Sequence, residues 1–282
     1  MFTKGVKYML VAGFVFALMN VFVKLVPNIP ATEIVFFRSV ISLVLSYGFL
    51  KGSQVNIWGG NKKILLLRGL SGAIALILYF ITLQAIPLAS AVTIQFLSPI
   101  FTSILGIFIV KERVKPLQWL FFLIAFGGIV VIQGFDHRIT PLYMIIGVFA
   151  AFFSGLAYNF IRKVNTTEHP LVIVFYFPLV TIPVTGAYSL FEWEQPVGRE
   201  WLFLLLIGVL TQVAQYFMTK AYQAEELSKV ASLKYISIIY ALGFGWIIFD
   251  ETFNLMTYVG MLVVLAGVSL NIWYKHSMAV KK

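Results

Sequence analysis

The sequence predicts an all-α integral membrane protein with ten transmembrane helices, arranged as two inverted five-helix repeats. Composition is the first indication: 60% of the residues are hydrophobic, only 11% are charged, and the mean hydropathy is +0.93. Soluble domains carry about a quarter charged residues, so a soluble globule is excluded. Length is the second, because 282 residues at about 20 per crossing hold roughly ten helices and leave no room for an extramembrane domain. An internal repeat, described below, is the third.

Apolar runs separated by charged residues, prolines and glycines give the candidate helices. We expect them at residues 5–26, 31–50, 64–86, 88–110, 116–134, 140–164, 170–190, 200–223, 227–249 and 255–274. The breaks are, in chain order, Pro27 to Pro30, the stretch 51–63, Pro87, the basic stretch 111–115, and the polar stretches 135–139, 165–169, 191–199, 224–226 and 250–254. The first run is too long for a signal peptide and has no small-residue cleavage site after it, so we expect a true span.

Lys and Arg residues are distributed unequally between the two predicted sides of the membrane. One side collects Lys4, Lys7, Lys51, Lys62, Lys63, Arg68, Lys111, Arg113, Lys115, Arg162, Lys163, Lys220, Lys229, Lys275, Lys281 and Lys282. The other holds Lys24, Arg138 and Arg199 beside the acidic residues Glu192, Glu194 and Glu200. Because cytoplasmic loops are enriched in Lys and Arg, we expect a multi-pass protein of the cell inner (plasma) membrane with both termini in the cytoplasm. The net charge of +10 is explained by this bias and does not indicate a nucleic-acid partner.

The chain matches itself without gaps at an offset of 139 positions. The matched pairs are Asn20 and Asn159, Lys24 and Lys163, Phe36 and Phe175, Gly69 and Gly208, Gln84 and Gln223, Gly106 and Gly245, Glu112 and Glu251, and Gly128 and Gly267. We therefore expect two homologous halves, residues 1–138 and 139–282. With five spans in each half, the second copy enters the membrane from the opposite side, and a pseudo-twofold axis lies in the membrane plane.

An inverted repeat of this kind favours transport by alternating access. Two such halves can adopt two conformations of similar energy, one open to each side, and this is the basis of alternating access. A duplication that only built a stable bundle is the alternative explanation, and we consider it the weaker one.

Several motifs identify a family. These are Asn20 and Lys24 on the first helix, Arg38 on the second, the segment Pro87-Leu88-Ala89-Ser90-Ala91, Pro99, the segment Lys111-Glu112-Arg113, and Gly127-Gly128. Together they resemble the EamA family of the drug/metabolite transporter superfamily over nearly the whole chain. The resemblance implies a metabolite transporter whose relatives export amino acids, drugs and other metabolites, while one related branch takes up S-adenosylmethionine. The second half departs from the pattern at Ile238, which replaces the equivalent of Pro99, and at Asp250-Glu251-Thr252, which makes the two predicted gates chemically unequal.

A polar stripe runs along the eighth predicted helix, where Gln212, Gln215, Tyr216, Thr219 and Gln223 share one face. Polar residues inside a span are expensive and face the bundle interior or water. Such a stripe either lines a cavity or hydrogen-bonds neighbouring helices. For the stripe as a whole we favour a cavity lining, and for a single residue the two readings stay open.

The third, fourth and sixth helices also carry polar faces, and Gln95 and Ser98 of the fourth are equivalent to Lys234 and Ser237 of the ninth. The full set of predicted substrate-binding residues is Asn20, Arg38, Ser71, Tyr79, Gln95, Ser98, Tyr158, Asn159, Gln212, Gln215, Tyr216, Lys234 and Ser237. The fifth and tenth helices are nearly free of polar residues at mid-depth, so we expect them outside the cavity.

Arg38 and Lys234 are cations within predicted spans. Each lies about seven residues, or roughly 10 Å, from a helix end, so the side chain could extend to the headgroups instead of facing a ligand. Glu33 is five positions from Arg38, which is the wrong spacing for an ion pair on one helix face, and Lys234 has no carboxylate one turn away. An unpaired interior cation implies an anionic ligand group or a partner from another helix.

Coupling to protons is poorly supported, because no Asp, Glu or His is placed near mid-membrane. Glu33 is the best remaining candidate, although a carboxylate at a helix end is usually solvated. Facilitated transport or exchange therefore fits better than coupled pumping. We expect no cofactor and no metal, and either a monomer or a homodimer.

Other function classes fit less well. The chain has no cysteine, which excludes thiolate chemistry and disulfides. It has no His-Glu-x-x-His, Gly-x-Ser-x-Gly or nucleotide-binding Gly-x-x-x-x-Gly-Lys motif, so we predict no enzyme and no ATP-driven transport. A channel is the more serious alternative, because polar stripes also line pores.

Overall fold

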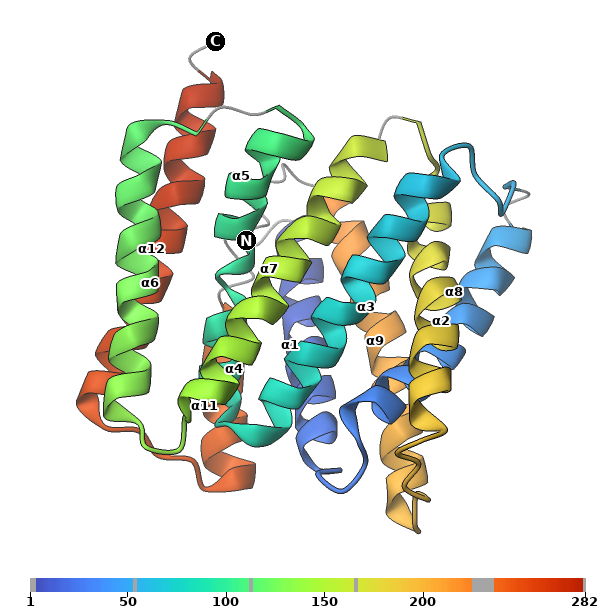
Figure 1. Ribbon diagram of the computed structural model, residues 1–282, viewed down its shortest axis with the longest axis horizontal. Coiled ribbons are helices and arrows are strands. Elements are labelled where there is room, and N and C mark those ends of the chain that lie inside the picture. The colour runs from blue at the N-terminus through green and yellow to red at the C-terminus, as the bar shows by residue number, and fades with distance from the viewer. Residues whose placement is uncertain (1–3, 53–54, 112–113, 165–166, 225–235, 281–282) are drawn as a thin grey trace.

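The computed structural model describes residues 4–52, 55–111, 114–164, 167–224 and 236–280, and all regular structure in these ranges is helical (Figure 1). The helices are α1 (Lys4–Lys24), α2 (Ala31–Gly52), α3 (Lys62–Ala85), α4 (Leu88–Gln95), α5 (Ser98–Ile109), α6 (Pro116–Phe135), α7 (Pro141–Val164), α8 (Pro170–Ser189), α9 (Arg199–Ala224), α11 (Ile236–Phe249) and α12 (Leu255–Val280). Within these residues nine segments are long and apolar enough to cross a membrane, with α4 and α5 forming one of them, and α11 is a shorter apolar helix. The chain is a multi-pass membrane protein.

The connections fall at two ends of the helix bundle. Those from α1 to α2, α3 to α4, α6 to α7, α8 to α9 and α11 to α12 lie at the bottom of Figure 1, which we call the lower end. The opposite end, with the connections from α2 to α3, α5 to α6 and α7 to α8, is the upper end. Successive spans therefore alternate in direction, as expected for helices that cross a membrane.

The fourth span is broken, whereas the sequence predicts one continuous helix over 88–110. The amides of Phe96 and Leu97 bond to carbonyls only three residues back, those of Thr93 and Ile94, at 3.1 and 3.0 Å. Pro99 follows in the first turn of α5, where it has no N–H to continue the α-helical ladder. Span four is thus two short helices that meet inside the bundle.

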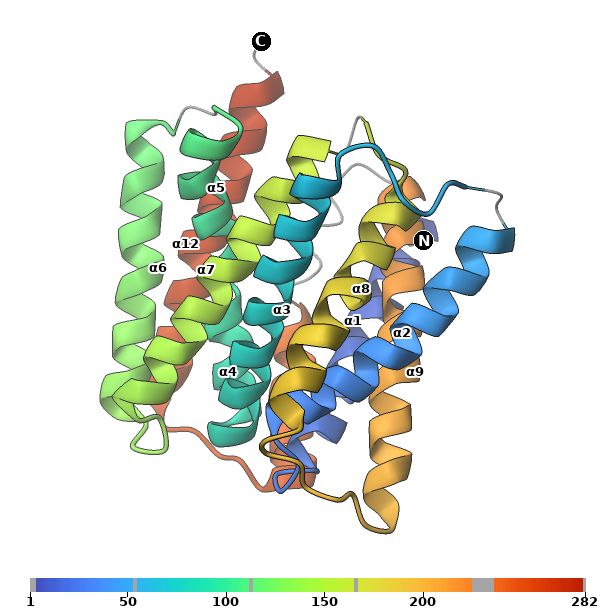
Figure 2. The same cartoon turned by 45° about the vertical axis from the view of Figure 1, so that its right-hand side comes forward.

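Helix pairing follows the repeat. Extensive contacts join α1 to α9 and α3 to α7, and these two pairs are equivalent when each half is exchanged for the other. The remaining large contacts, between α2 and α8 and between α6 and α12, each join a helix to its own equivalent. Figures 1 and 2 show α3 and α7 side by side from two directions. This pattern is expected of two homologous halves related by a pseudo-twofold axis.

Glycines make the contact between α6 and α12 on both sides of that axis. A Cβ on Gly128 would lie 2.7 Å from the amide nitrogen of Val264, and a Cβ on Gly267 would lie 2.7 Å from the amide nitrogen of Ala125. Residues 128 and 267 are equivalent, and so are 125 and 264. Small residues let helix backbones approach closely in lipid. The same backbone contact is therefore made twice.

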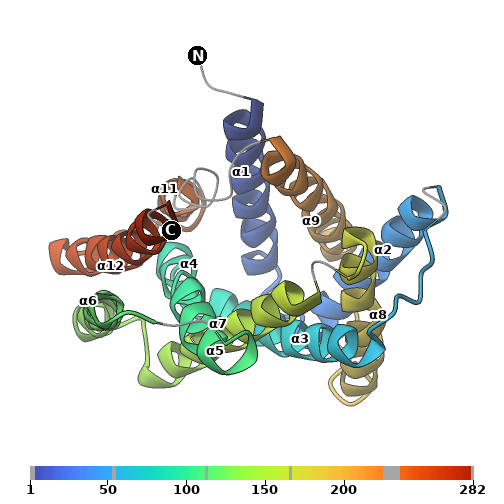
Figure 3. The same cartoon turned by 90° about the horizontal axis from the view of Figure 1, so that it is seen from above.

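The view from above separates an outer pair of helices from a central group. In Figure 3, α6 and α12 lie together at one edge, α2 and α8 at the other, and α1, α3, α4, α7 and α9 lie between them. Gln118 of α6 donates to Asn271 of α12 at 2.8 Å, so the one polar residue early in α6 is used within this outer pair.

The apolar core is unequal at the two ends. Its largest cluster includes Val26, Ile34, Leu83, Ile86 and Leu88, which are all fully buried at the lower end. The upper end has two small separate clusters, one around Leu50, Leu65 and Val164 and one around Met9, Ala12 and Ala221. Among the described residues, the largest cluster includes these lower-end side chains and extends along α6 and α12 to Phe122 and Val268, whereas the two upper-end clusters are small.

Candidate substrate-binding site

Arg38 of α2 is buried inside the bundle with 7% of its surface exposed. Its Nε donates to Thr211 Oγ1 of α9 at 2.9 Å. Its guanidinium carbon lies 5.9 Å from the ring centroid of Phe80 and 5.8 Å from that of Phe177. The side chain does not extend to the headgroups, so of the two sequence-based alternatives the interior one describes its position.

Arg38 and Phe177 are equivalent positions of the two repeats, on α2 and α8. Thr211, which holds Arg38, is likewise equivalent to Gly72, and a Cβ on Gly72 would lie 3.0 Å from the ring of Phe177. Arg38 and Phe177 thus contact each other. Arg38 also contacts Thr211, and Phe177 lies against Gly72, the position equivalent to Thr211. The pseudo-twofold axis therefore passes between Arg38 and Phe177, and for inverted repeats that axis lies near the membrane midplane.

Arg68 is a second, half-buried cation at this point, whereas the charge distribution in the sequence predicts it on the cytoplasmic side. It lies inside α3, six residues or about 9 Å from the start of that helix. Its guanidinium carbon is 4.9 Å from the ring centroid of Phe177. Arg68 follows the first residues of an apolar run and lies beyond Lys62 and Lys63, and this position in the sequence could have identified it as a cation within the span.

The two arginines have buried donors without partners. Arg38 Nη1, Arg68 Nε and Arg68 Nη1 are shielded from solvent and have no hydrogen-bond acceptor among the described residues. Within the same residues no carboxylate forms an ion pair with either guanidinium. The site therefore presents positive charge and hydrogen-bond donors that the described part of the protein leaves unused.

Asn20 and Tyr79 join α1 to α3. Asn20 Nδ2 donates to the Tyr79 hydroxyl at 3.0 Å, while Asn20 Oδ1 is buried without a donor among the described residues. Both are predicted site residues, and the structure brings them into direct contact.

Gln95, Ser98 and Asn159 surround the break between α4 and α5. Gln95 Nε2 donates to Ser154 Oγ of α7 at 2.7 Å, and its Oε1 is buried without a donor in the described part of the chain. Asn159 Nδ2 donates to the Thr102 carbonyl at 2.9 Å. Ser98 is buried at the start of α5. Gln95 and Asn159 therefore join α7 to α4 and to α5, and none of the three residues lies on a helix that carries an arginine.

Other predicted site residues make structural contacts or face outward. The Ser71 hydroxyl donates to the Leu67 carbonyl of its own helix at 2.7 Å. Gln212 Nε2 lies 3.3 Å from the Ser42 carbonyl of α2, which is the interhelical role that sequence reasoning left open. Tyr158 and Tyr216 are 45% and 53% exposed.

The polar stripe on α9 is therefore divided. Gln215 and Ser237 are half-buried. Lys234 lies outside the described residues, and so do the side chains of Thr219 and Gln223. The stripe includes one interhelical contact and one outward tyrosine, so it is not a uniform cavity lining.

A polar network closes the lower end. Glu251 Oε1 pairs with Lys24 Nζ at 2.7 Å, and Glu251 Oε2 accepts from the Leu88 amide at 2.8 Å. Lys24 Nζ also donates to the Ile86 carbonyl at 2.6 Å. The offset of 139 positions predicts that Glu112 and Glu251 cap equivalent helix ends on opposite faces of the membrane, and in the structure the Glu251 carboxylate caps the start of α4 in the other half. Its equivalent, Glu112, lies outside the described residues.

Arg138 strengthens the same end. It pairs with Asp136 at 2.8 Å and donates to the Thr252 carbonyl at 2.7 Å. The hydrogen bond with Asp136 raises the pKa of the Arg138 guanidinium above its ordinary value. These contacts join the connection after α6 to the one after α11.

Glu33 is fully buried, which corrects the expectation that this helix-end carboxylate is solvated. Its Oε2 accepts from the Glu194 amide at 3.1 Å, and its Oε1 has no donor among the described residues. The connection between α8 and α9 folds back over the start of α2 and removes the carboxylate from water.

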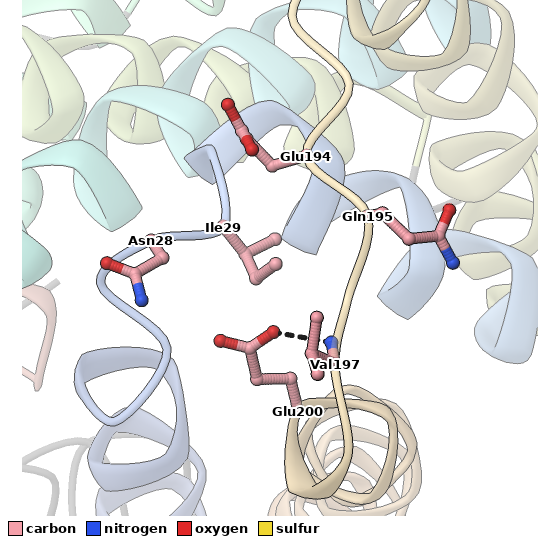
Figure 4. Close-up of a pocket in the computed structure, with 6 residues that line it drawn as sticks. All are labelled: Asn28, Ile29, Glu194, Gln195, Val197 and Glu200. Carbon is pink, nitrogen blue, oxygen red and sulfur yellow. Dashed lines mark hydrogen bonds between the residues drawn. The ribbon is translucent and has the colours of Figure 1, made fainter.

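A pocket of about 520 Å³ lies at the lower end and contains none of the predicted site residues. Figure 4 shows it between the connection that precedes α2 and the one that precedes α9, lined by Asn28, Ile29, Glu194, Gln195, Val197 and Glu200. The Glu200 carboxylate is already used by the Val197 amide at 2.7 Å. In the described residues no group of three or more His, Asp or Glu side chains could hold a metal.

The known proteins that are similar in sequence to this chain include an exporter, a solute carrier and a vitamin transporter. The chain is 33% identical over 271 residues to the pseudopaline exporter CntI of Pseudomonas aeruginosa, which covers 95% of each protein. It is 29% identical to human solute carrier family 35 member G1, covering 97% of this chain and 80% of the relative, and 24% identical to the riboflavin transporter of Vibrio cholerae, covering 94% and 92%. A protein of known crystal structure has the same fold, with a TM-score of 0.63 and 17% identity over 99% of this chain and 98% of the other.

These relatives are transporters and not enzymes. The model of the EamA-like transporter family matches residues 3–134 and again residues 141–273. The duplicated helix arrangement, the paired glycines and these matches agree, and the chain belongs to the EamA-like transporter family.

Proposed function

We propose that the protein exports small organic metabolites, such as amino acids or related compounds, by alternating access through a central cavity. The halves 1–138 and 139–282 would move against each other around a site on the pseudo-twofold axis. The contact between the equivalent positions Arg38 and Phe177 carries this proposal, because a buried polar site on such an axis can be exposed to either side by exchanging the conformations of the halves.

The upper end faces the cytoplasm of the cell inner membrane in this proposal. The upper connections and the helix ends beside them carry eight basic residues, namely Lys51, Lys62, Lys63, Lys111, Arg113, Lys115, Arg162 and Lys163, whereas the lower ones carry Lys24, Arg138 and Arg199. From the positive-inside rule we infer that both termini lie in the cytoplasm.

The described conformation would be closed to the outside. Support comes from the large apolar cluster at the lower end and from the ion pair of Lys24 and Glu251, which joins the two halves there. Opening to the outside would require this pair to separate.

The relatives favour transport, and one of them favours export. An exporter is 33% identical over nearly the whole chain, and a riboflavin transporter is also related. We propose facilitated efflux or exchange, because the buried carboxylates among the described residues, Glu33, Asp136, Glu168 and Glu251, lie at the two ends of the bundle and do not form a chain across the membrane.

Efflux from proteoliposomes tests this proposal. The purified protein is reconstituted into liposomes loaded with a metabolite extract, and the compounds that leave are identified by mass spectrometry against protein-free liposomes. We expect selective, saturable efflux that is accelerated when the same compound is present outside. Flux that neither saturates nor exchanges would indicate a channel, and the absence of selective flux would contradict transport altogether.

A further inference from the structure

We propose that Arg38 and Arg68 together bind an organic substrate that carries two anionic groups, beside the Phe177 ring that both guanidinium groups approach. This inference rests on the proposed transport function and specifies its substrate class. It predicts that dicarboxylates, or compounds of similar charge, are preferred to neutral compounds of the same size.

The first argument is electrostatic. Burying an arginine away from water is costly, and two like charges that face one ring repel each other as well. The hydroxyl of Thr211 is a neutral partner, and aromatic faces offset only part of this cost. Charged residues inside membrane spans mark substrate or ion pathways and pair with an opposite charge. The described residues supply no such charge at this site, so a ligand is the source we infer.

The second argument is geometric. Each guanidinium carbon lies within 6 Å of the ring centroid of Phe177, at 5.8 Å for Arg38 and 4.9 Å for Arg68. The two carbons are therefore no more than about 11 Å apart. A carboxylate on each guanidinium leaves a gap that a short carbon chain spans, and the aromatic ring offers that chain an apolar surface.

The third argument is that the site is positioned from several elements. Thr211 of α9 holds Arg38 through Nε, which leaves Nη1 for a ligand. Gly72 of α3 lets the Phe177 ring of α8 pack closely beside Arg68, since a Cβ there would lie 3.0 Å from that ring. Arginine side chains that are restrained in this way lose less freedom when they bind a carboxylate.

The location gives this charge a role in transport. Arg38 and Phe177 lie on the axis between the halves, so a ligand bound there contacts both. A dianion that bridges α2 and α3 of the first half across a ring of the second half would be carried from one side to the other without leaving the guanidinium groups.

Binding of matched probes tests the inference. Glutarate, glutaramate and glutaramide have the same carbon chain and carry two, one and no negative charges. Their affinities for the purified full-length protein in neutral detergent are measured by titration calorimetry, together with those of succinate, adipate and inorganic phosphate. We expect glutarate to bind more tightly than glutaramate, and glutaramate more tightly than glutaramide.

Variants assign that preference to the two arginines. Arg38→Gln and Arg68→Gln should each weaken glutarate binding about tenfold or more, because each removes a charge-assisted hydrogen-bonding partner. Lys63→Gln is the matched control, since it makes the same charge change on the same helix at an exposed position, and it should leave the affinity unchanged. Arg38→Lys and Arg68→Lys keep the charge and should weaken binding less, which distinguishes loss of a binding group from loss of the fold.

Several outcomes would overturn the inference. One is that no dicarboxylate and no phosphate binds more tightly than glutaramide, and another is that Lys63→Gln weakens binding as much as Arg68→Gln. A third is an anionic phospholipid that copurifies, disappears in Arg68→Gln and is not displaced by glutarate, which would assign the arginines to a lipid headgroup. If neutral compounds leave the proteoliposomes selectively and Arg38→Gln does not change their efflux, the transport proposal stands and the dianion inference fails.

Discussion

At the contact of α6 with α12, Gly128 lies against Val264 and Gly267 lies against Ala125, so the two repeats make the same contact twice. At the contact of α2 with α8 the geometry is equally symmetric, but the equivalent side chains are Arg38 and Phe177. The first contact preserves the helix packing that duplication created. The second contact places one charged and one aromatic side chain at equivalent positions. The two halves therefore have the same helix arrangement but different side chains near the pseudo-twofold axis.

The largest effect is expected from breaking the contact between the halves at the lower end. Glu251→Gln leaves the buried Lys24 ammonium without its counter-ion and should lower the free energy of unfolding by about 3 kcal/mol. The thermal midpoint of the detergent-solubilised protein measures this. Asp250→Asn, at an exposed neighbouring carboxylate, is the control and should have little effect. If Glu251→Gln were as stable as the control, the ion pair would not hold the lower end closed.

The symmetry of α6 and α12 predicts equal costs at equivalent glycines. Gly128→Ala and Gly267→Ala each place a Cβ 2.7 Å from a backbone nitrogen and should each destabilise the protein by about 2 kcal/mol. Gly127→Ala meets nothing within 4 Å and should be neutral or slightly stabilising, since alanine favours helix more than glycine. A large difference between the first two variants in the thermal midpoint would show that the contact is not symmetric.

A smaller and more selective effect is expected at the axis. Thr211→Val removes the acceptor of Arg38 Nε and should weaken glutarate binding about fivefold, and it should lower the free energy of unfolding by about 1 kcal/mol because a buried donor loses its partner. The ratio of affinities for glutarate and glutaramate should fall in the same variant, because Arg38 is no longer held in place. An unchanged ratio would remove Thr211 as a positioning residue.

The smallest effect concerns the backbone at two equivalent helix ends. Lys111 and Asp250 have positive φ angles of 57° and 51°, and they are equivalent positions. Lys111→Gly and Asp250→Gly should each stabilise the protein by less than about 1 kcal/mol, because glycine adopts this conformation without a Cβ clash. Destabilisation by either one would show that its side chain contributes more than its backbone costs.

The symmetric part of the molecule was predictable from the sequence, and the asymmetric part was less so. Matched glycines and apolar periodicity predict the spans and their duplication, because these depend on spacing along one chain. The break after Gln95 was missed, because Pro99 was read as lying within a helix rather than near the start of one.

The site was only partly predictable. Arg38 was identified because a cation within an apolar run is conspicuous, whereas Arg68 was grouped with the nearby lysines. Its proximity to Phe177 depends on how α3 packs against α8, which no pattern within α3 encodes. Glu33 was taken as solvated because the connection that covers it comes from the other half of the chain.

Inverted topology is the central claim, and single cysteines at equivalent positions test it most directly. The chain has no cysteine, so Asn28→Cys and Thr167→Cys, both at exposed equivalent positions, each introduce one reactive thiol. A membrane-impermeant maleimide is applied to intact cells and to inverted membrane vesicles. We expect Asn28→Cys to react in cells and Thr167→Cys to react in inverted vesicles. Labelling of both from the same side would contradict the inverted repeat and, with it, the placing of Arg38 and Phe177 on an axis between two exchangeable halves.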